Sequence, residues 1–304
     1  MTAAFPVDIG APIEAVPPPV PDGVYYDLAE RLYRRQTRLS YSGAKVLLRS
    51  AAHYLVDRQN PKPSTEEQRF GTAFHAELLE PGRLDEMVVA LPEDAPKRPT
   101  RVQLEAAKPS AKTLEAIAWW KDFDAMAGTR LVLDGADAAR IQGMLAAVRA
   151  HGGARRLLAQ GRPEVSLLWT DGRYQVPCKC RIDWLRPDGV MVDVKTTVDA
   201  SPEAFARQAA GLMYHMQTAG YFSGAEHVLN ETPPAWAWIA VEKEPPYGVS
   251  TCVAPADAIL AGVRLWDIAL GRYRDALDTG TWPAYAETIE PLQFPQWALR
   301  VRTF

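Results

Sequence analysis

Residues 180–197 read Cys-Arg-Ile-Asp183-Trp-Leu-Arg-Pro-Asp-Gly-Val-Met-Val-Asp193-Val-Lys195-Thr-Thr. Two β-rich runs, 175–185 and 189–197, flank the turn Arg186-Pro-Asp-Gly189, a pattern that predicts a β-hairpin. Alternate residues of a strand share a face, so Asp193 and Lys195 project together and the hairpin can bring Asp183 beside them. Carboxylate oxygens bind hard divalent cations, and a neighbouring ammonium can hold or deprotonate a metal-bound water. The stretch therefore predicts a metal site on a hairpin.

Three further elements accompany this hairpin. Gly71-Thr-Ala-Phe-His75 lies on a predicted helix that runs to Leu79, and Gln217-Thr-Ala-Gly-Tyr221 lies on the helix that follows the Lys195 strand. Pro163-Glu164 places a carboxylate at the start of the strand before the hairpin. An Asp-Val-Lys strand end is by itself usually only a solvated edge. The ordered set makes a catalytic metal site the better interpretation.

These elements, in this order, resemble the RecB-like branch of the PD-(D/E)xK nuclease superfamily. Within that branch, the sequences of 41–81, 190–205 and 282–292 resemble the exonuclease VIII (RecE) catalytic domain in particular. The resemblance covers roughly residues 39 to 300. It implies an α/β fold with an αβββαβ core, in which helices flank a central mixed sheet, with helical N-terminal and middle elaborations.

The resemblance also implies an activity and partners. The expected enzyme is a divalent-metal-dependent exodeoxyribonuclease that uses Mg²⁺ or Mn²⁺, two ions per active site, on linear double-stranded DNA in the 5′ to 3′ direction, in phage-type homologous recombination. The expected partners are double-stranded DNA ends, further copies of the chain in a homo-oligomeric ring, and a single-strand annealing protein. Two alternatives stay open: a structure-specific or single-strand endonuclease on the same core, and a non-catalytic DNA-end-binding assembly protein.

The resemblance gives the candidate metal ligands separate roles. Asp183 is expected to bridge two metal ions. Asp193 and the backbone carbonyl of Val194 are expected to bind the ion on the side of the nucleophile. His75 is expected to bind the other ion through a neutral ring nitrogen.

The other candidate catalytic residues lie around these ligands. Lys195 is expected to orient the attacking water and to help deprotonate it, although two adjacent carboxylates push the pKa of Lys195 upward. Glu164 is expected to hold a metal-bound water. Gln217 and Tyr221, one helical turn apart, are expected to contact Lys195 or a DNA phosphate. Tyr214 and Arg207 fall on the same predicted helical stripe.

The bulk charge gives no general argument for nucleic-acid binding, because the 304-residue chain has a net charge of −3 and a pI near 6.0. Short runs of basic residues nevertheless supply positive charge locally. We expect some of them to line a groove that offsets phosphate charge. These residues are Arg31, Arg34, Arg35, Arg38, Lys97, Arg98, Arg101, Lys108, Lys112, Arg155, Arg156 and Arg162.

The sequence predicts a protein of the bacterial host cytosol without membrane contact, since no apolar run approaches about 20 residues and the N-terminus does not resemble a signal peptide. Cys178, Cys180 and Cys252 are too few for the iron–sulfur cluster that some RecB-like nucleases carry. We expect free thiols, with Cys178 and Cys180 facing away from Asp183.

The expected organisation is a flexible arm at 1–38, which includes a proline-rich run, and a single nuclease domain at 39–304 with a helical insertion at about 85–155. Residues 92–109 are polar, basic and proline-containing, which is typical of a mobile loop. Residues 202–228 are expected to form one long helix, begun by Ser201-Pro202-Glu203.

Overall fold

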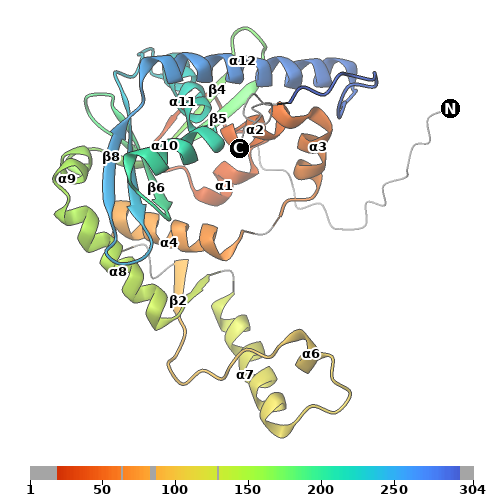
Figure 1. Cartoon of the computed structure of the whole chain (residues 1–304), viewed down its shortest axis with the longest axis vertical. Coiled ribbons are helices and arrows are strands. Elements are labelled where there is room, and N and C mark those ends of the chain that lie inside the picture. Colours follow the sequence, from red (N-terminus) through yellow and green to blue (C-terminus); the bar gives the residue numbers. More distant parts are fainter. Residues whose placement is uncertain (1–18, 63, 83–86, 129, 295–304) are drawn as a thin grey trace, which may run out of the picture.

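A computed structural model describes residues 19–62, 64–82, 87–128 and 130–294. Figure 1 shows a main body built on a β-sheet, from which a smaller lobe projects at the bottom of the view. The lobe contains α6 (Arg101–Leu104) and α7 (Ala111–Ala127). None of the helices in the described ranges combines the length and apolarity that crossing a membrane requires.

The body is organised by a six-stranded sheet with the spatial order β1-β4-β5-β6-β7-β8. The pairing of β6 with β7 is parallel and all other neighbours are antiparallel, so the predicted mixed sheet is confirmed. The strands are β1 (Gly23–Tyr25), β4 (Arg162–Thr170), β5 (Pro177–Leu185), β6 (Met191–Thr197), β7 (Trp236–Glu242) and β8 (Val249–Val253). A helix, the three strands β4 to β6, a second helix and β7 follow one another along the chain, which gives the expected αβββαβ core.

Helices cover both faces of this sheet. One core lies under α2 (Tyr41–Arg49), α3 (Ala51–Gln59), α11 (Tyr214–Val228) and α12 (Ala256–Thr279). The other lies under α4 (Glu66–Leu79), α8 (Gly135–Ala150) and α9 (Gly152–Leu158). Strand β6 contributes side chains to both cores, because Met191 packs in the first core while Val192 and Val194 pack in the second.

The chain from Tyr41 to Gln59 forms the two helices α2 and α3, which meet at Ser50. Ser40 caps α2 by accepting a hydrogen bond from the backbone N–H of Gly43, as its position predicts. Ser50 then adopts an extended conformation (φ −172°, ψ 158°), which ends α2, and its hydroxyl accepts from His53 N–H at the start of α3. One serine therefore serves both helix ends and turns the chain between them.

The prediction of one long helix at 202–228 is wrong. The structure has α10 (Pro202–Gly211) and α11, separated by Met213 in the left-handed region with φ +59°. A left-handed residue cannot continue a right-handed helix. The hydroxyl of Tyr41 donates to the carbonyl of Leu212 at the break. Residues of α10 and α11 therefore do not share one continuous stripe.

The N-terminal segment is also more structured than expected. Within 19–38, which the sequence assigned to a flexible arm, β1 pairs with β4 and α1 (Glu30–Arg35) packs beside β5. Lys179, 6% exposed, donates hydrogen bonds to the carbonyls of Tyr33, Arg34 and Gln36 at the end of α1. A cation suits a helix C-terminus. The arm prediction is wrong for these residues, and 1–18 lie outside the described part.

The middle insertion contains strands besides the helices predicted there. Strands β2 (Val88–Ala90) and β3 (Leu131–Leu133) pair in parallel at the base of the lobe. The segment 92–109 includes the short helix α6, which begins with a capping box of Thr100 and Gln103. The mobility expected of that segment stays a prediction.

Candidate active site

Three carboxylates lie in one row across neighbouring strands. Strand β4 pairs with β5 so that Pro163 opposes Trp184 and Val165 opposes Ile182, which sets Glu164 opposite Asp183. Strand β5 pairs with β6 through Trp184 and Val192. Continued by one position, this register would set Asp183 opposite Asp193. The pairing therefore brings Glu164, Asp183 and Asp193, hereafter the acid row, to the same level of the sheet.

The strand ladder opens at the acid row. Strands β5 and β6 pair only at the two positions next to their turn, Trp184 with Val192 and Leu185 with Met191. Beyond them the carboxylate of Asp183 replaces a backbone partner, since its Oδ2 accepts a hydrogen bond of 2.8 Å from Val194 N–H. Separated strands leave room for side chains from both sheet faces to meet.

Asp193 is the most enclosed member of the row, with 2% of its surface exposed. Gln217 of α11 donates to its Oδ1 at 2.9 Å. The Nζ of Lys195 lies 2.7 Å from both carboxylate oxygens, with good hydrogen-bond geometry to Oδ1. Burial raises the pKa of Asp193 to about 6, Lys195 opposes the rise and Asp183 adds to it. The prediction that Asp193 and Lys195 project together is confirmed.

Lys195 is held as a cation. Burial alone lowers the pKa of Lys195, but Asp193 and Asp183 more than offset this and hold it above its usual value. Its Nζ also lies 5.0 Å from the ring centroid of Tyr214, within the range of a cation–π contact. Without a bound cation this charge balance keeps Lys195 protonated, as a hydrogen-bond donor to Asp193.

His75 reaches the row from α4, on the other side of the sheet. Its Nδ1 lies 3.6 Å from Asp183 Oδ2. Burial, and next the nearby Lys195 charge, lower the pKa of His75 to about 4. The imidazole is therefore neutral at physiological pH, which is the form that binds metal ions. A Cβ on Gly71 would lie 3.6 Å from Thr196 Oγ1, which is an ordinary contact, so α4 has room for a side chain at this position.

Glu164 has both an unusual backbone and an unusual charge environment. Its φ of +51° lies in the left-handed region, which costs roughly 1 kcal/mol for a residue with a Cβ. Burial and then Asp183 raise the pKa of Glu164 to about 8, against the effect of Arg181. Arg181 lies 3.9 Å from Glu164 and also bonds Ser166 Oγ at 2.8 Å and the carboxylate of Glu30.

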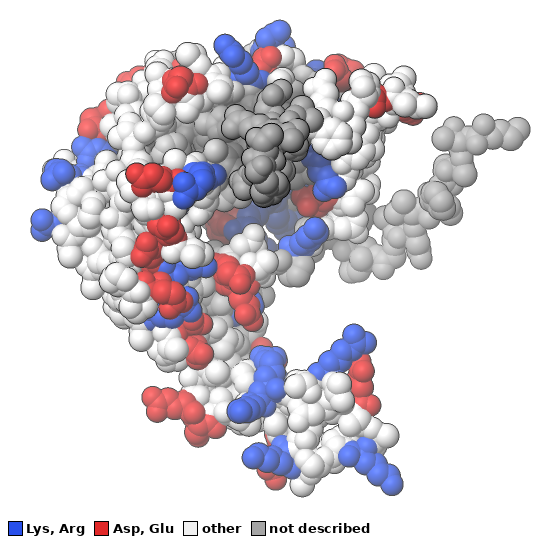
Figure 2. All heavy atoms as spheres, in the orientation of Figure 1, with Lys and Arg blue, Asp and Glu red and all other residues white. Residues whose placement is uncertain are grey.

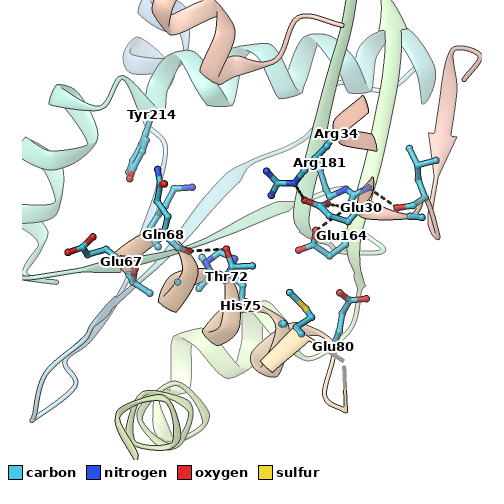
Figure 3. Close-up of a pocket in the computed structure, with 18 of the residues that line it drawn as sticks. Glu30, Arg34, Glu67, Gln68, Thr72, His75, Glu80, Glu164, Arg181 and Tyr214 are labelled. Carbon is cyan, nitrogen blue, oxygen red and sulfur yellow. Dashed lines mark hydrogen bonds and ion pairs between the residues drawn. The ribbon is translucent and has the colours of Figure 1, made fainter. Parts of the chain in front are cut away.

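The acid row lies beside a cleft of about 1030 Å³ between α1 and α4. Figure 3 shows Glu30 and Arg34 of α1 with Glu164 and Arg181 on one side, and Gln68, Thr72 and His75 of α4 on the other. Lys195 and Tyr214 also line the cleft, whereas Asp193 is enclosed behind them. A substrate in the cleft would meet Lys195 and Glu164 directly.

The residues present fit a divalent cation. Burial raises the pKa of Asp183 as well as of Asp193, so both buried anions lack full charge compensation. The 3.6 Å between His75 Nδ1 and Asp183 Oδ2 lets one ion contact both atoms. Within the described residues no group of three or more His, Cys, Asp or Glu is arranged to hold an ion.

Two residues of the predicted α11 stripe lie elsewhere. Tyr221 packs edge-on against Trp236, with ring centroids 5.1 Å apart, and burial raises its pKa well above the usual value. It supports the site from the core without a hydrogen bond to Lys195 among the described residues. Arg207 lies exposed on α10, beyond the Met213 break. Of the stripe, Gln217 and Tyr214 reach the site.

Sequence reasoning missed the cations that border the acid row. Arg181 and Lys179 precede Asp183 at alternate positions of β5, and both point toward α1. The period-two pattern Lys-x-Arg-x-Asp carried the signal, because side chains two apart in a strand share a face. Cys178 and Cys180 alternate with them and are buried in the opposite core, as predicted.

Comparison with known proteins agrees with this geometry. The sequence of residues 40–294 matches the family described as a PDDEXK-like domain of unknown function (DUF3799). The solved structure of a candidate exonuclease from Eubacterium rectale is similar, with a TM-score of 0.57 at 13% identity over 88% of this chain and 96% of that one. A phage-related exonuclease from Haemophilus somnus 129PT matches with a TM-score of 0.32 at 13% identity, over 61% and 91% of the two chains. No curated protein sequence matches significantly.

The family match spans most of the chain and includes every candidate residue of the site. The Eubacterium rectale structure has the same fold over almost its full length. The resemblance to the PD-(D/E)xK superfamily is thereby confirmed, and the acid row with Lys195 lies where the hairpin pattern predicted it. This chain belongs to the PDDEXK-like family and has the core of a nuclease.

Proposed function

We propose that this chain is a divalent-metal-dependent exodeoxyribonuclease that degrades linear double-stranded DNA, in the 5′ to 3′ direction. The observation that carries the proposal is the acid row beside Lys195 at an open cleft, in a chain of the PDDEXK-like family. A nuclease needs anionic ligands for a cation and a donor near the scissile phosphate. The acid row and Lys195 supply both beside the cleft.

Asp183 and Asp193 would hold the cation, with the Val194 carbonyl and with His75 as the ligand of a second ion. A bound Mg²⁺ or Mn²⁺ would polarise the phosphodiester and lower the pKa of a water molecule. Gln217 fixes Asp193 from behind through Oδ1, so the carboxylate keeps its orientation. Asp183 is fixed in the same way by Val194 N–H. Both ligands are thus positioned in advance.

Lys195 would donate hydrogen bonds to the attacking water or to a phosphate oxygen. Its raised pKa supports an orienting role over that of general base. Glu164 has a pKa of about 8, close to neutrality, so its carboxyl is suited to take up or release a proton beside the reacting phosphate. Tyr214 supports the Lys195 ammonium through its ring.

The similarity of the sequence to RecE adds further parts to the proposal. These are the preference for duplex DNA, the 5′ to 3′ polarity, a role in phage-type recombination, a ring of identical chains and a single-strand annealing partner. The exonuclease description of the Eubacterium rectale protein concerns that protein and motivates the substrates of the test. Endonuclease activity on the same core is the alternative outcome.

The test compares end-labelled linear duplex with covalently closed circular DNA, with and without Mg²⁺. We expect metal-dependent loss of the 5′ label from linear DNA and intact circles. The control is Asp193→Asn, which removes one ligand charge while keeping the shape of the side chain. Cleavage of closed circles at the same rate as linear duplex would show an endonuclease and contradict the exonuclease assignment. Absence of cleavage with both Mg²⁺ and Mn²⁺ would contradict catalysis.

A further inference from the structure

The outer end of the lobe concentrates positive charge. Figure 2 shows Lys and Arg side chains around the end of the lobe, at the lower right of the view. Residues 97–112 contain five cationic side chains and the single carboxylate of Glu105, a net charge of +4, whereas the whole chain carries −3. The five are Lys97, Arg98, Arg101, Lys108 and Lys112.

The two arginines of this segment have partners within the lobe. Arg98 lies 3.9 Å over the ring of Trp120 and forms two hydrogen bonds with Asp124, of 3.0 and 2.7 Å. Arg101 pairs with Glu105 at 2.7 Å. The guanidinium of Arg98 thus ties the basic segment to α7, and its charge is locally neutralised.

The three lysines have no such partner. Lys97, Lys108 and Lys112 are exposed and form no hydrogen bond or ion pair within the described residues. Across the wider segment 91–128 carboxylates and cations are equal in number, so the positive excess belongs to 97–112, and its three lysines contribute no ion pair to the described part of the lobe. An anion from outside would be their natural counterpart.

The lobe has its own packed core, which holds the lysines in place. Trp120 and Phe123 are each 7% exposed, and the ring of Trp119 stacks on Phe123 with centroids 4.9 Å apart. Trp120 Nε1 donates to the Pro96 carbonyl at 2.8 Å, which fastens the basic segment to the helix. The lysines therefore stand on a folded support and not on a loose chain.

We propose that Lys97, Lys108 and Lys112 bind the phosphate backbone of duplex DNA outside the cleft, as a second DNA contact remote from the acid row. In Figure 1 the lobe lies beyond α4, which forms one wall of the cleft, so the lysines lie further out on that side. A duplex adds about 3.4 Å for each base pair, so a duplex whose end lies in the cleft and which runs outward past α4 extends toward the lobe.

This inference rests on the proposed function, because it takes DNA as the ligand of the cleft. The experiment measures equilibrium binding of wild type and of the triple variant Lys97→Gln, Lys108→Gln, Lys112→Gln, with Ca²⁺ to suppress cleavage. Two blunt duplexes are used, of about 8 and about 40 base pairs, which span roughly 27 and 136 Å. Only the longer one extends well beyond the cleft.

For the long duplex we expect the triple variant to bind at least about tenfold more weakly near 0.1 M salt, with a salt slope smaller by about 2 to 3, since each phosphate contact contributes about 0.9. Affinity for the short duplex should stay unchanged. Lys121→Gln is the matched control for Lys112→Gln. Both lysines are exposed on α7, and nine residues turn the helix by about half a circle. Only Lys112→Gln should weaken long-duplex binding.

Unchanged affinity of the triple variant for the long duplex would overturn the inference, and so would an equal loss for both lengths. Thermal unfolding and circular dichroism check that the variant folds, because a collapsed lobe would lose the Trp119–Phe123 packing. Failure of the proposed function gives a different result. Wild type would then bind the long duplex through the lysines without cleaving it in Mg²⁺ or Mn²⁺.

Discussion

Glu164 offers a sharp test of the acid row, because its folded-state pKa of about 8 lies far above its ordinary value of 4.5. A carboxyl group whose pKa is raised by folding stabilises the fold fully below its unfolded pKa, and that stability is lost as the pH rises through the folded pKa. Metal-free protein should therefore lose stability up to about pH 8. Lys179, whose pKa burial lowers to about 8, titrates in the same window with the opposite sign, so the contribution of Glu164 is the difference between wild type and Glu164→Gln.

The size of the effect follows from the same shift. Each pH unit in this window changes the free energy of unfolding by at most about 1.4 kcal/mol per group. The Glu164 side chain is 29% exposed, so solvent screens part of the interaction and we expect a loss of about 1–2 kcal/mol over the window. With an unfolding entropy of about 2.1 cal/mol/K per residue, this corresponds to a fall of roughly 2–3 °C in Tm.

The assay is thermal unfolding in EDTA at several pH values, for wild type, Glu164→Gln and the exposed control Glu231→Gln. The Glu164 variant should be more stable than wild type at pH 8 and should lack the decline. Saturating Mn²⁺ should stabilise wild type at pH 8 because it binds only the folded state. The same slope in Glu164→Gln as in wild type would refute the raised pKa of Glu164, caused by burial and then by Asp183, as the source of the decline.

Two predictions concern the other residues of the site. Lys195→Ala should retain metal and DNA-end binding but cleave at least ~100-fold more slowly, with a milder loss in Gln217→Ala. Single-turnover rates beside end-binding affinities at one salt concentration test this, and near-wild-type cleavage without Lys195 would make Asp193-Val-Lys195 an ordinary strand end. Asp183→Ala should abolish Mn²⁺ binding at both sites, whereas His75→Ala should weaken one. Unchanged Mn²⁺ stoichiometry and affinity in Asp183→Ala, measured by calorimetric titration, would contradict the bridging role.

The hairpin could be predicted from sequence because it depends on local signals. Alternating apolar residues and the Arg186-Pro-Asp-Gly189 turn fix β5 and β6, and the turn fixes their register. That register places Asp183 level with Asp193. Gln217 could be found because helical spacing directs it toward the sheet from α11.

Other features depend on contacts distant in sequence. The proline-rich run near the N-terminus favoured a flexible arm, whereas Lys179 and Arg181 of β5 hold α1 against the sheet. Tyr221 has the spacing of a site residue, but the turn of α11 directs it against Trp236. Most of 202–228 has helical propensity, but α10 ends at Gly211 and the left-handed Met213 begins a new helix, which a reading of average propensity does not reveal.

The break at Met213 has a consequence for how this family can vary in sequence. In an uninterrupted helix, inserting one residue turns every later side chain by about 100°, and Gln217 would leave Asp193. A left-handed residue joins two helices whose rotations are independent. Tyr41 holds the carbonyl of Leu212 at that joint, so α11 keeps its own anchor. Relatives should therefore accept insertions and deletions in α10 while keeping the length from the joint to Gln217 fixed.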